Sequence, residues 1–154
     1  NECIAKVLPD LRGIEHRLEK VSVIEGVTYY NDSKATNIES VIAAIQSFAK
    51  PIILILGGED KNTNFKSLAP FINNNIKKIV SYGKANNKIS IALRDAVELK
   101  KVFSLRDAVD ECKKSAVSGD VILLSPGCAS FDQFRNYEHR GNEFKKIVKN
   151  VVYA

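Results

Sequence analysis

The chain has 154 residues, a length typical of one domain with an ordinary hydrophobic core. Hydrophobic residues make up 45% of it and charged residues 27%, which excludes a disordered or low-complexity protein. The net charge of +5 comes from scattered lysines and arginines without a groove-reading motif, so no nucleic-acid partner is expected. The apolar runs are too short to span a membrane and no signal-peptide pattern opens the chain, so we expect a cytoplasmic protein with no membrane partner.

The start of the chain indicates a piece of a longer protein, because it begins with Asn1 and contains no methionine. Residues 1–10 show no clear pattern and are interpreted as a linker or the tail of a preceding domain. A preceding domain would hold part of the chemistry.

The three cysteines, Cys3, Cys112 and Cys128, are odd in number and lack the spacing of a metal site, so reduced thiols are expected. A nucleophilic Cys128 is conceivable, but its neighbours are small and neither histidine is placed by sequence to act as its base. A packing role is the favoured interpretation.

The first predicted element is a β-hairpin. Two β-branched runs, residues 18–24 and 27–30, flank the dipeptide Glu25-Gly26, which is typical of a two-residue turn.

The hairpin is followed by a predicted helix and a buried strand. Apolar residues recur at helical spacing over residues 38–48, with Thr36 or Asn37 as N-cap and Pro51 as the stop. Residues 51–56 have no polar alternation, which is typical of a parallel strand covered on both faces.

Strands and helices alternate over the rest of the chain. This order predicts an α/β, Rossmann-like three-layer domain, in which a mostly parallel sheet with an N-terminal β-hairpin has helices on both faces. The remaining elements are a short helix at 65–72, a strand at 77–83, a helix at 89–93, a weaker strand at 97–102, a helix at 105–116 opened by Ser104, a strand at 121–124 and a closing helix at 144–151 with Lys145, Lys146 and Lys149 on its solvent side.

Three polar loops follow three apolar runs: the first loop (residues 31–37), the second loop (57–61) and the third loop (125–130). If the three runs are parallel neighbours, the loops converge on one edge of the sheet, where open α/β sheets bind ligands. Lysines, hydroxyls and free backbone N–H groups would then meet in one cleft, which suits an anionic ligand.

Each loop also has a simpler interpretation. The polar residues of the first loop are those that helix caps need, and Gly57-Gly58 is compatible with an ordinary turn. The second loop is not a Walker motif, because no Gly-Lys-Ser/Thr follows at the required spacing. In the third loop, Ser130 has no Gly-x-Ser-x-Gly elbow, so a binding hydroxyl is favoured over a hydrolase nucleophile.

Taken together, these segments resemble the C-terminal domain of the Mur ligase family. The resemblance covers residues 11–154, and the residues that carry it are 15–19, 31–37, 56–58 with Lys61, and 123–141. The first loop and the run from Ser125 to Phe134 are its most specific parts.

The resemblance implies an activity for the whole protein. Family members join a carboxylate to an amine with ATP and Mg²⁺, through an acyl phosphate that the amine attacks. The loops are most similar to those of the member that adds D-glutamate to UDP-N-acetylmuramoyl-L-alanine in peptidoglycan biosynthesis. In such a ligase an N-terminal domain holds the UDP end, a central domain holds the ATP phosphates and metal, and a mobile C-terminal domain brings D-glutamate. The fragment alone is expected to be an inactive monomer.

The resemblance also implies roles for individual residues. Arg17 and Lys34 would be catalytic, and no metal ligand is assigned. For His16, the resemblance leaves two locations open, one near the nucleotide and one on the surface. Tyr137 stands where relatives often have Phe. The nucleotide-binding set is His16, Arg17, Asp32 and Lys34, and the D-glutamate-binding set is Thr36, Lys61, Ser130, Phe131 and Tyr137.

Two alternatives remain. One is a non-catalytic module that holds a nucleotide or an acidic metabolite, which an upstream Gly-Lys-Thr phosphate loop in the parent gene would exclude. The other is a folylpolyglutamate-type ligase with the same three-domain plan, against which the run from Ser130 to Phe134 argues.

Overall fold

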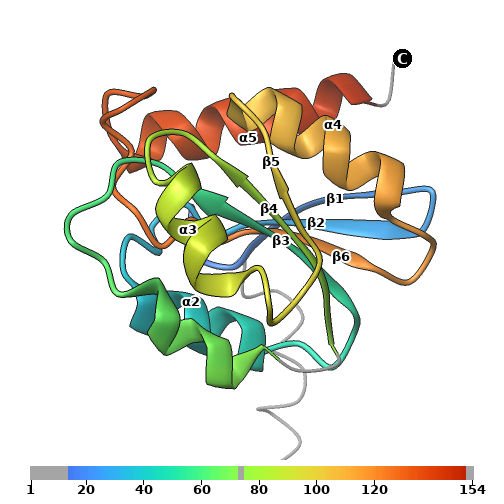
Figure 1. Cartoon of the computed structure of the whole chain (residues 1–154). Helices are drawn as coiled ribbons and strands as arrows, with labels where there is room; N and C mark the ends of the chain where they lie inside the picture. Colours follow the sequence, from blue (N-terminus) through green and yellow to red (C-terminus); the bar gives the residue numbers. More distant parts are fainter. Residues whose placement is uncertain (1–13, 73–74, 152–154) are drawn as a thin grey trace, which may run out of the picture.

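A six-stranded sheet forms the centre of the computed structural model, which describes residues 14–72 and 75–151 (Figure 1). The predicted linker at 1–10 and Cys3 lie outside the described residues. Every pair of neighbouring strands is parallel except β1 and β2. In spatial order the strands are β1 (Glu19–Ile24), β2 (Val27–Asn31), β6 (Val121–Leu124), β3 (Ile52–Gly57), β4 (Ile76–Tyr82) and β5 (Leu99–Lys101).

Helices cover both faces of this sheet, so the predicted three-layer α/β architecture is confirmed (Figure 1). One face packs against α2 (Ile38–Gln46), the 3₁₀ helix η2 (Phe65–Phe71) and α3 (Asn86–Leu93). The other packs against α4 (Leu105–Ser115) and α5 (Tyr137–Val151). Alternate residues of β3 point into the two cores, with Leu54 on the α2 side and Ile55 on the α5 side.

The predicted hairpin is present, with Ile24 opposite Val27. Glu25 and Gly26 both have positive φ, 51° and 78°, as a two-residue turn of the primed type requires. Gly26 is also confined by packing, because a Cβ there would lie 2.1 Å from the hydroxyl oxygen of Ser118.

Side-chain caps open two of the predicted helices. Asn37 caps α2 by accepting a 2.8 Å hydrogen bond from the backbone of Ser40, which decides between the two proposed caps. Ser104 and Asp107 form a reciprocal capping box at the start of α4. The expected stop at Pro51 is wrong, because α2 already ends at Gln46 and Pro51 directly precedes β3.

Two elements differ in kind or length from the prediction. The segment from Phe65 is a 3₁₀ helix with Pro70 inside it, a residue that disfavours longer α-helical hydrogen bonding. Helix α5 begins at Tyr137, seven residues before the predicted start at Phe144. Lys145 does not lie on its solvent side, because its side chain is only 19% exposed and pairs with Glu15 and Glu19.

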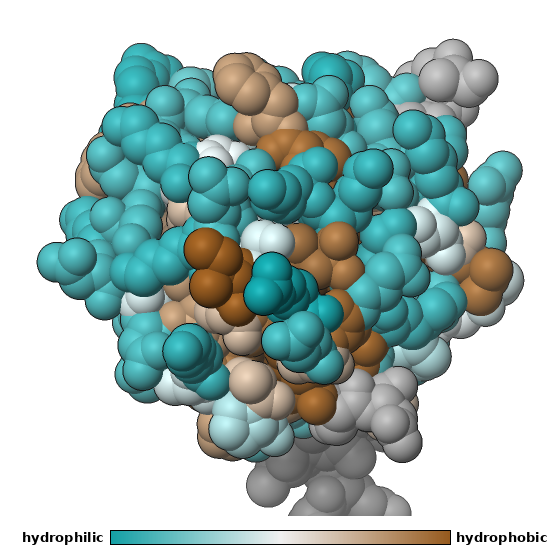
Figure 2. All heavy atoms as spheres, in the orientation of Figure 1, coloured by the Kyte–Doolittle hydropathy of each residue, from teal (hydrophilic) through white to brown (hydrophobic). Residues whose placement is uncertain are grey.

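The face of the molecule shown in Figure 2 is mostly hydrophilic. In the view of Figure 2, hydrophobic side chains emerge in a limited area near the centre, in the region of α3 in Figure 1. Helix α3 carries the exposed Ile91. Among the described residues, no helix combines the length and the apolar character that crossing a membrane requires.

Candidate functional site

The three loops meet at the carboxyl ends of β2, β6 and β3, which are adjacent in the sheet. The backbone N–H of Asp32 donates to Leu124 O at 2.8 Å, and that of Gly127 donates to Ala35 O at 2.8 Å. The second loop joins the third through an isolated bridge between Glu59 and Ala129. The predicted convergence on one edge is therefore confirmed, and the loops are fixed to one another by main-chain hydrogen bonds.

Gly57 and Gly58 are required by close packing of backbone against backbone. Their φ values are 138° and 129°, and a Cβ at Gly57 would lie 2.1 Å from Tyr82 O. At Gly58 a Cβ would lie 2.3 Å from Ala129 O. The close approach that these glycines allow is thus to neighbouring loops and strands of the domain.

Asp32 lies beneath the first loop, with only 4% of its surface exposed. Its Oδ1 accepts a 3.1 Å hydrogen bond from Leu18 N, and its Oδ2 accepts one of 2.8 Å from Ser125 Oγ. Burial raises the pKa of this carboxyl group, and the two hydrogen bonds partly offset that effect. Asp32 therefore connects the first loop, the third loop and the segment that carries Arg17.

Arg140 was not predicted as part of the site, and it is completely buried. Its Nε and Nη2 donate to Ser33 Oγ and Ser33 O at 2.9 and 2.8 Å, and its Nη1 donates to Cys128 O at 3.0 Å. One side chain from α5 thus joins the first loop to the third.

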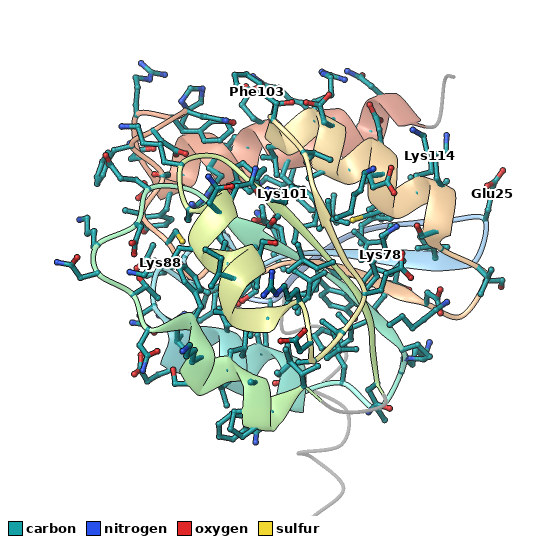
Figure 3. All side chains as sticks on the ribbon, viewed as in Figure 1. Glu25, Lys78, Lys88, Lys101, Phe103 and Lys114 are labelled. Carbon is teal, nitrogen blue, oxygen red and sulfur yellow. The ribbon has the colours of Figure 1, made fainter. Side chains whose placement is uncertain are left out.

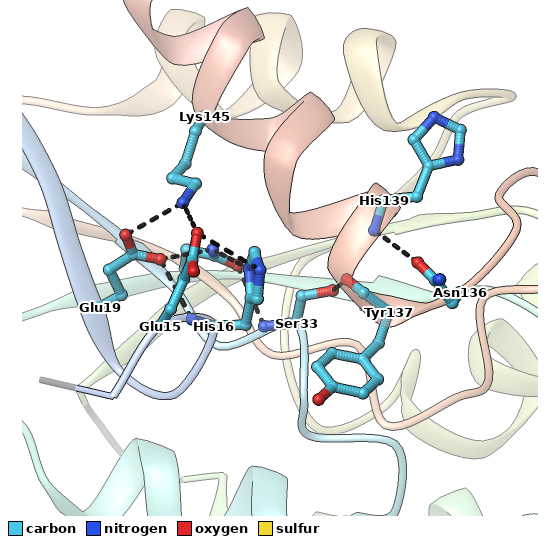
Figure 4. A network of polar contacts seen from close by, with 9 residues as sticks. Glu15, His16, Glu19, Ser33, Asn136, Tyr137, His139 and Lys145 are labelled. Atoms are coloured by element: carbon cyan, nitrogen blue, oxygen red, sulfur yellow. Dashed lines mark hydrogen bonds and ion pairs between the residues drawn. The ribbon is translucent and has the colours of Figure 1, made fainter.

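A polar network holds the segment before β1, which carries Arg17, against α5 (Figure 4). His16 is 4% exposed, and its Nδ1 lies 2.9 Å from Asn31 Nδ2. Lys145 on α5 pairs with Glu15 at 2.7 Å and with Glu19 at 3.2 Å. The surface location considered for His16 is therefore wrong, because His16 is buried although the neighbouring Arg17 is exposed.

Two hollows flank the first loop. The first hollow, of about 230 Å³, lies between this loop and α2 and contains three of the predicted nucleotide-binding residues, Arg17, Asp32 and Lys34. The Nζ of Lys34 lies 5.7 Å from the ring centre of Tyr137. This hollow therefore combines two exposed cations with one buried carboxylate.

The second hollow, of about 300 Å³, lies between the first loop and η2 and contains Thr36 and Lys61, two of the predicted D-glutamate-binding residues. The Nζ of Lys61 lies 5.3 Å from the ring centre of Phe131, which is 59% exposed. Ser130 is 2% exposed and does not line this hollow.

The structure thus divides the predicted residues in a way that the sequence did not. Thr36 and Lys61 line the second hollow, and the Phe131 ring lies beside Lys61. Tyr137 lies instead beside Lys34 and within 6.0 Å of the His16 ring, so its neighbours belong to the nucleotide-binding set.

The turn that carries Lys61 has its own support. Asp60 accepts hydrogen bonds of 2.7 Å from Thr63 N and from the Nζ of Lys88, which projects from α3 (Figure 3). Although burial acts in the opposite direction, the contacts with Lys88 and Thr63 lower the pKa of Asp60. This turn keeps Lys61 exposed and free of ion pairs among the described residues.

Cys128 has the packing role that the sequence favoured. It is 1% exposed, and burial raises the pKa of its thiol to about 12, although the nearby charge of Arg140 lowers it. Cys112 on α4 is also buried and free. A thiol with so high a pKa is a poor nucleophile at neutral pH.

Chemically, this edge of the sheet is suited to anions. Arg17, Lys34 and Lys61 are exposed cations around the first loop, and carboxylates and phosphates are their natural ligands. The described part of the chain has no group of three or more His, Cys, Asp or Glu side chains that could hold a metal ion.

Comparison with known proteins shows the family. A protein from Koribacter versatilis (strain Ellin345), named "UDP-N-acetylmuramoylalanine--D-glutamate ligase", is 43% identical over 98% of this chain and 33% of its own length. The chain spans about a third of the length of the curated relatives that it matches.

Two solved structures support the same fold. UDP-N-acetylmuramate-alanine ligase MurC from Thermotoga maritima has a TM-score of 0.62 and 14% identity, over 95% of this chain and 33% of that one. A bifunctional folylpolyglutamate synthase/dihydrofolate synthase from Yersinia pestis CO92 has a TM-score of 0.63 and 11% identity, over 94% and 32%. The sequence profile of the family described as "Mur ligase, glutamate ligase domain" matches residues 16–128, and the chain therefore belongs to this family.

Proposed function

We propose that the protein containing this chain is the ATP-dependent ligase that adds D-glutamate to UDP-N-acetylmuramoyl-L-alanine in peptidoglycan biosynthesis. In this proposal the domain described above binds D-glutamate and closes over ATP. Two further domains, which hold the UDP end of the acceptor and the ATP phosphates, are its partners within the same protein.

The main support is the arrangement of cations around the first loop. Lys34 faces the first hollow and Lys61 faces the second, on either side of a loop that the sheet edge holds in place. D-glutamate carries two carboxylates, and such a ligand needs cationic and hydroxyl groups on a rigid support. Thr36 and Lys61 supply these groups at the second hollow. The Phe131 ring lies beside Lys61, and we place it and Ser130 in the same D-glutamate-binding set.

Arg17, Asp32 and Lys34 would hold part of ATP at the first hollow, whose two cations fit a phosphate-bearing ligand. When bound, ATP supplies the phosphate that activates the acceptor carboxylate. Arg17 is exposed and next to the buried His16, so it can approach phosphates when the domains close. Magnesium would be held by the central domain, because the described residues of this chain offer no metal-binding cluster.

The requirement for a particular amino-acid substrate distinguishes the proposed function from the two alternatives that the sequence leaves open. A folylpolyglutamate-type ligase would use L-glutamate with a folate acceptor, and a binding module would release no phosphate at all. The relatives named as D-glutamate ligases, which are 38–46% identical to this chain, favour the D-glutamate assignment.

The test is phosphate release by the full-length protein with ATP and Mg²⁺. Release is expected only when D-glutamate and UDP-N-acetylmuramoyl-L-alanine are both present. L-glutamate, L-lysine and meso-diaminopimelate serve as matched amino-acid controls. Equal release with L-lysine or meso-diaminopimelate would overturn the substrate assignment.

A further inference from the structure

Arg140 is a buried charge that forms no ion pair with a carboxylate in the described part of the chain. It is 0% exposed, and none of the ion pairs within the described residues includes it. A buried guanidinium is costly unless its N–H groups are hydrogen-bonded. Here the oxygens that accept them, Ser33 Oγ, Ser33 O and Cys128 O, all belong to the loops of the site.

The guanidinium lies where the three loops meet. Ser33 directly precedes Lys34 in the first loop, and Cys128 lies two residues before Ser130 in the third loop. A Cβ at Gly58 in the second loop would lie 3.1 Å from Nη1 of Arg140. The guanidinium therefore hydrogen-bonds to the first and third loops and lies close to the second.

Ser33 extends this connection back to α5. Its Oγ donates a 2.8 Å hydrogen bond to Tyr137 O, in the first turn of the helix that carries Arg140. The same oxygen accepts the hydrogen bond from Arg140 Nε. A lysine at position 140 would keep a positive charge but could not replace the planar fork that reaches both loops.

We propose that Arg140 is a positioning residue whose guanidinium sets the spacing between the first and third loops, and so aligns the groups that hold the two carboxylates of the amino-acid substrate. Its effect on substrate rests on the proposed function, whereas its effect on the loops does not. Arg140 touches no substrate in this role.

The loop-spacing role can be measured without any substrate. Cys128 lies in the third loop and Cys112 in α4, and both thiols are buried. Local loosening of the loops exposes only Cys128, whereas global unfolding exposes both. Maleimide labelling followed by peptide mass spectrometry reports each thiol separately, so Cys112 is an internal control within the same molecule.

Removing the charge of Arg140 should by itself slow the labelling of Cys128. The positive charge of Arg140 lowers the pKa of the Cys128 thiol, so removing this charge leaves less thiolate and slows labelling. Faster labelling of Cys128 in an Arg140→Met variant would therefore report increased exposure.

The variants are Arg140→Lys, Arg140→Met and Ser33→Ala in the full-length protein, with Val109→Ala as control. Val109 is buried in α4 on the α5 side of the sheet, so its truncation lowers stability without touching the loops. Ser33→Ala removes one oxygen and keeps the charge, so it keeps the test valid if the Arg140 variants do not fold.

We expect the loop variants to label Cys128 at least about tenfold faster relative to Cys112, because the loss of a single buried hydrogen bond has an effect of that order and each variant removes at least one. We also expect the KM for D-glutamate to rise on the order of tenfold with a much smaller change in kcat, because misplaced binding groups weaken substrate binding. Val109→Ala should show neither effect.

Unchanged Cys128 labelling, or an increase that Cys112 matches, would overturn the positioning role. Selective labelling with an unchanged KM would overturn the link to the amino-acid substrate. Failure of the wild-type protein to use D-glutamate would instead refute the proposed function, and the labelling experiment would still decide the role of Arg140.

Discussion

Replacing Lys61 by alanine is the most direct test of the second hollow. Lys61 is exposed, forms no ion pair among the described residues and contacts the ring of Phe131 at 5.3 Å. Its removal leaves no buried group unpaired, so the domain should keep its fold. The substitution therefore separates ligand binding from stability.

The expected magnitudes follow from these contacts. An exposed cation–π contact contributes about 0.5–1 kcal/mol, so the free energy of unfolding should fall by no more than about 1 kcal/mol. A hydrogen bond to a charged group contributes about 1.5–3 kcal/mol, which corresponds to roughly 10-fold to 150-fold in affinity. Because Lys61 is exposed and screened by salt, we expect the lower end, a rise in the D-glutamate KM of about tenfold.

The assay is phosphate release by the full-length protein at varied D-glutamate and varied ATP. The KM for ATP should stay close to the wild-type value, because Lys61 lies outside the first hollow. Lys66→Ala is the matched control, since Lys66 is another exposed lysine but does not border the second hollow. A change in the ATP KM alone, or an equal effect of both substitutions, would refute the reasoning.

Substitutions at three further positions test interactions that stabilise the domain. Asp32→Asn should change the free energy of unfolding at pH 7 by no more than about 1 kcal/mol. Burial raises the pKa of the Asp32 carboxyl group, so its charge adds little stability, and the amide oxygen of asparagine can still accept the hydrogen bond from Leu18 N. The pKa of Asp32 is higher in the folded state than its reference value of 3.8, so the folded protein binds the proton more tightly. Wild type should therefore gain free energy of unfolding relative to Asp32→Asn as the pH falls through the folded-state pKa towards 3.8. A relative loss of stability in calorimetry over this pH range would contradict this. Glu111→Gln should destabilise the protein above pH 4.5, because hydrogen bonding to Lys78 lowers the pKa of Glu111 in the folded state. The difference from wild type should disappear as the pH falls below 4.5 through the folded-state pKa. A difference that does not depend on pH in denaturant titrations would show that the ion pair of Glu111 and Lys78 is not its cause. Asn37→Ala removes the cap of α2 and should cost about 1 kcal/mol in urea unfolding, whereas Asn37→Gly should cost less.

The strands could be predicted because a strand buried on both faces has an apolar sequence without polar alternation. All residues of β3 and β6 are buried, and both strands are apolar runs without alternation. No comparable sequence pattern indicates the order of the strands in the sheet. The chain passes through β3, β4 and β5 before β6 inserts between β2 and β3, so the convergence of the loops depended on an assumption about strand neighbours.

The early start of α5 was missed because its first buried residue is charged. Arg140, Phe144, Ile147 and Val148 are buried at helical spacing, so extending the pattern back from Phe144 by four residues would have reached Arg140. A search for apolar residues alone stops at Phe144. An arginine at a core position of a helix pattern is itself a signal, because such a side chain needs several buried oxygens around it.

The placement of Tyr137 depended on tertiary structure in the same way. The family resemblance places it in the D-glutamate set together with Ser130 and Phe131. Once α5 begins at Tyr137, the ring projects from a helix and reaches Lys34. Phe131 and Tyr137 are close in the chain, but Phe131 lies beside Lys61 and Tyr137 beside Lys34.

Burial divides the site into a frame and a rim, and this division explains which changes the fold can tolerate. Asp32, Ser33 and Arg140 form the frame, and each donates or accepts hydrogen bonds between loops, so a change there leaves buried groups without partners. Lys61 and Phe131 form the rim, where exposure makes a substitution cheap for the fold. Frame variants should therefore lower stability and raise the D-glutamate KM together, except where the substitute keeps the hydrogen bonds, as in Asp32→Asn. Rim variants should change the KM alone, and a rim variant that lowers stability as much as Ser33→Ala would show that this division is wrong.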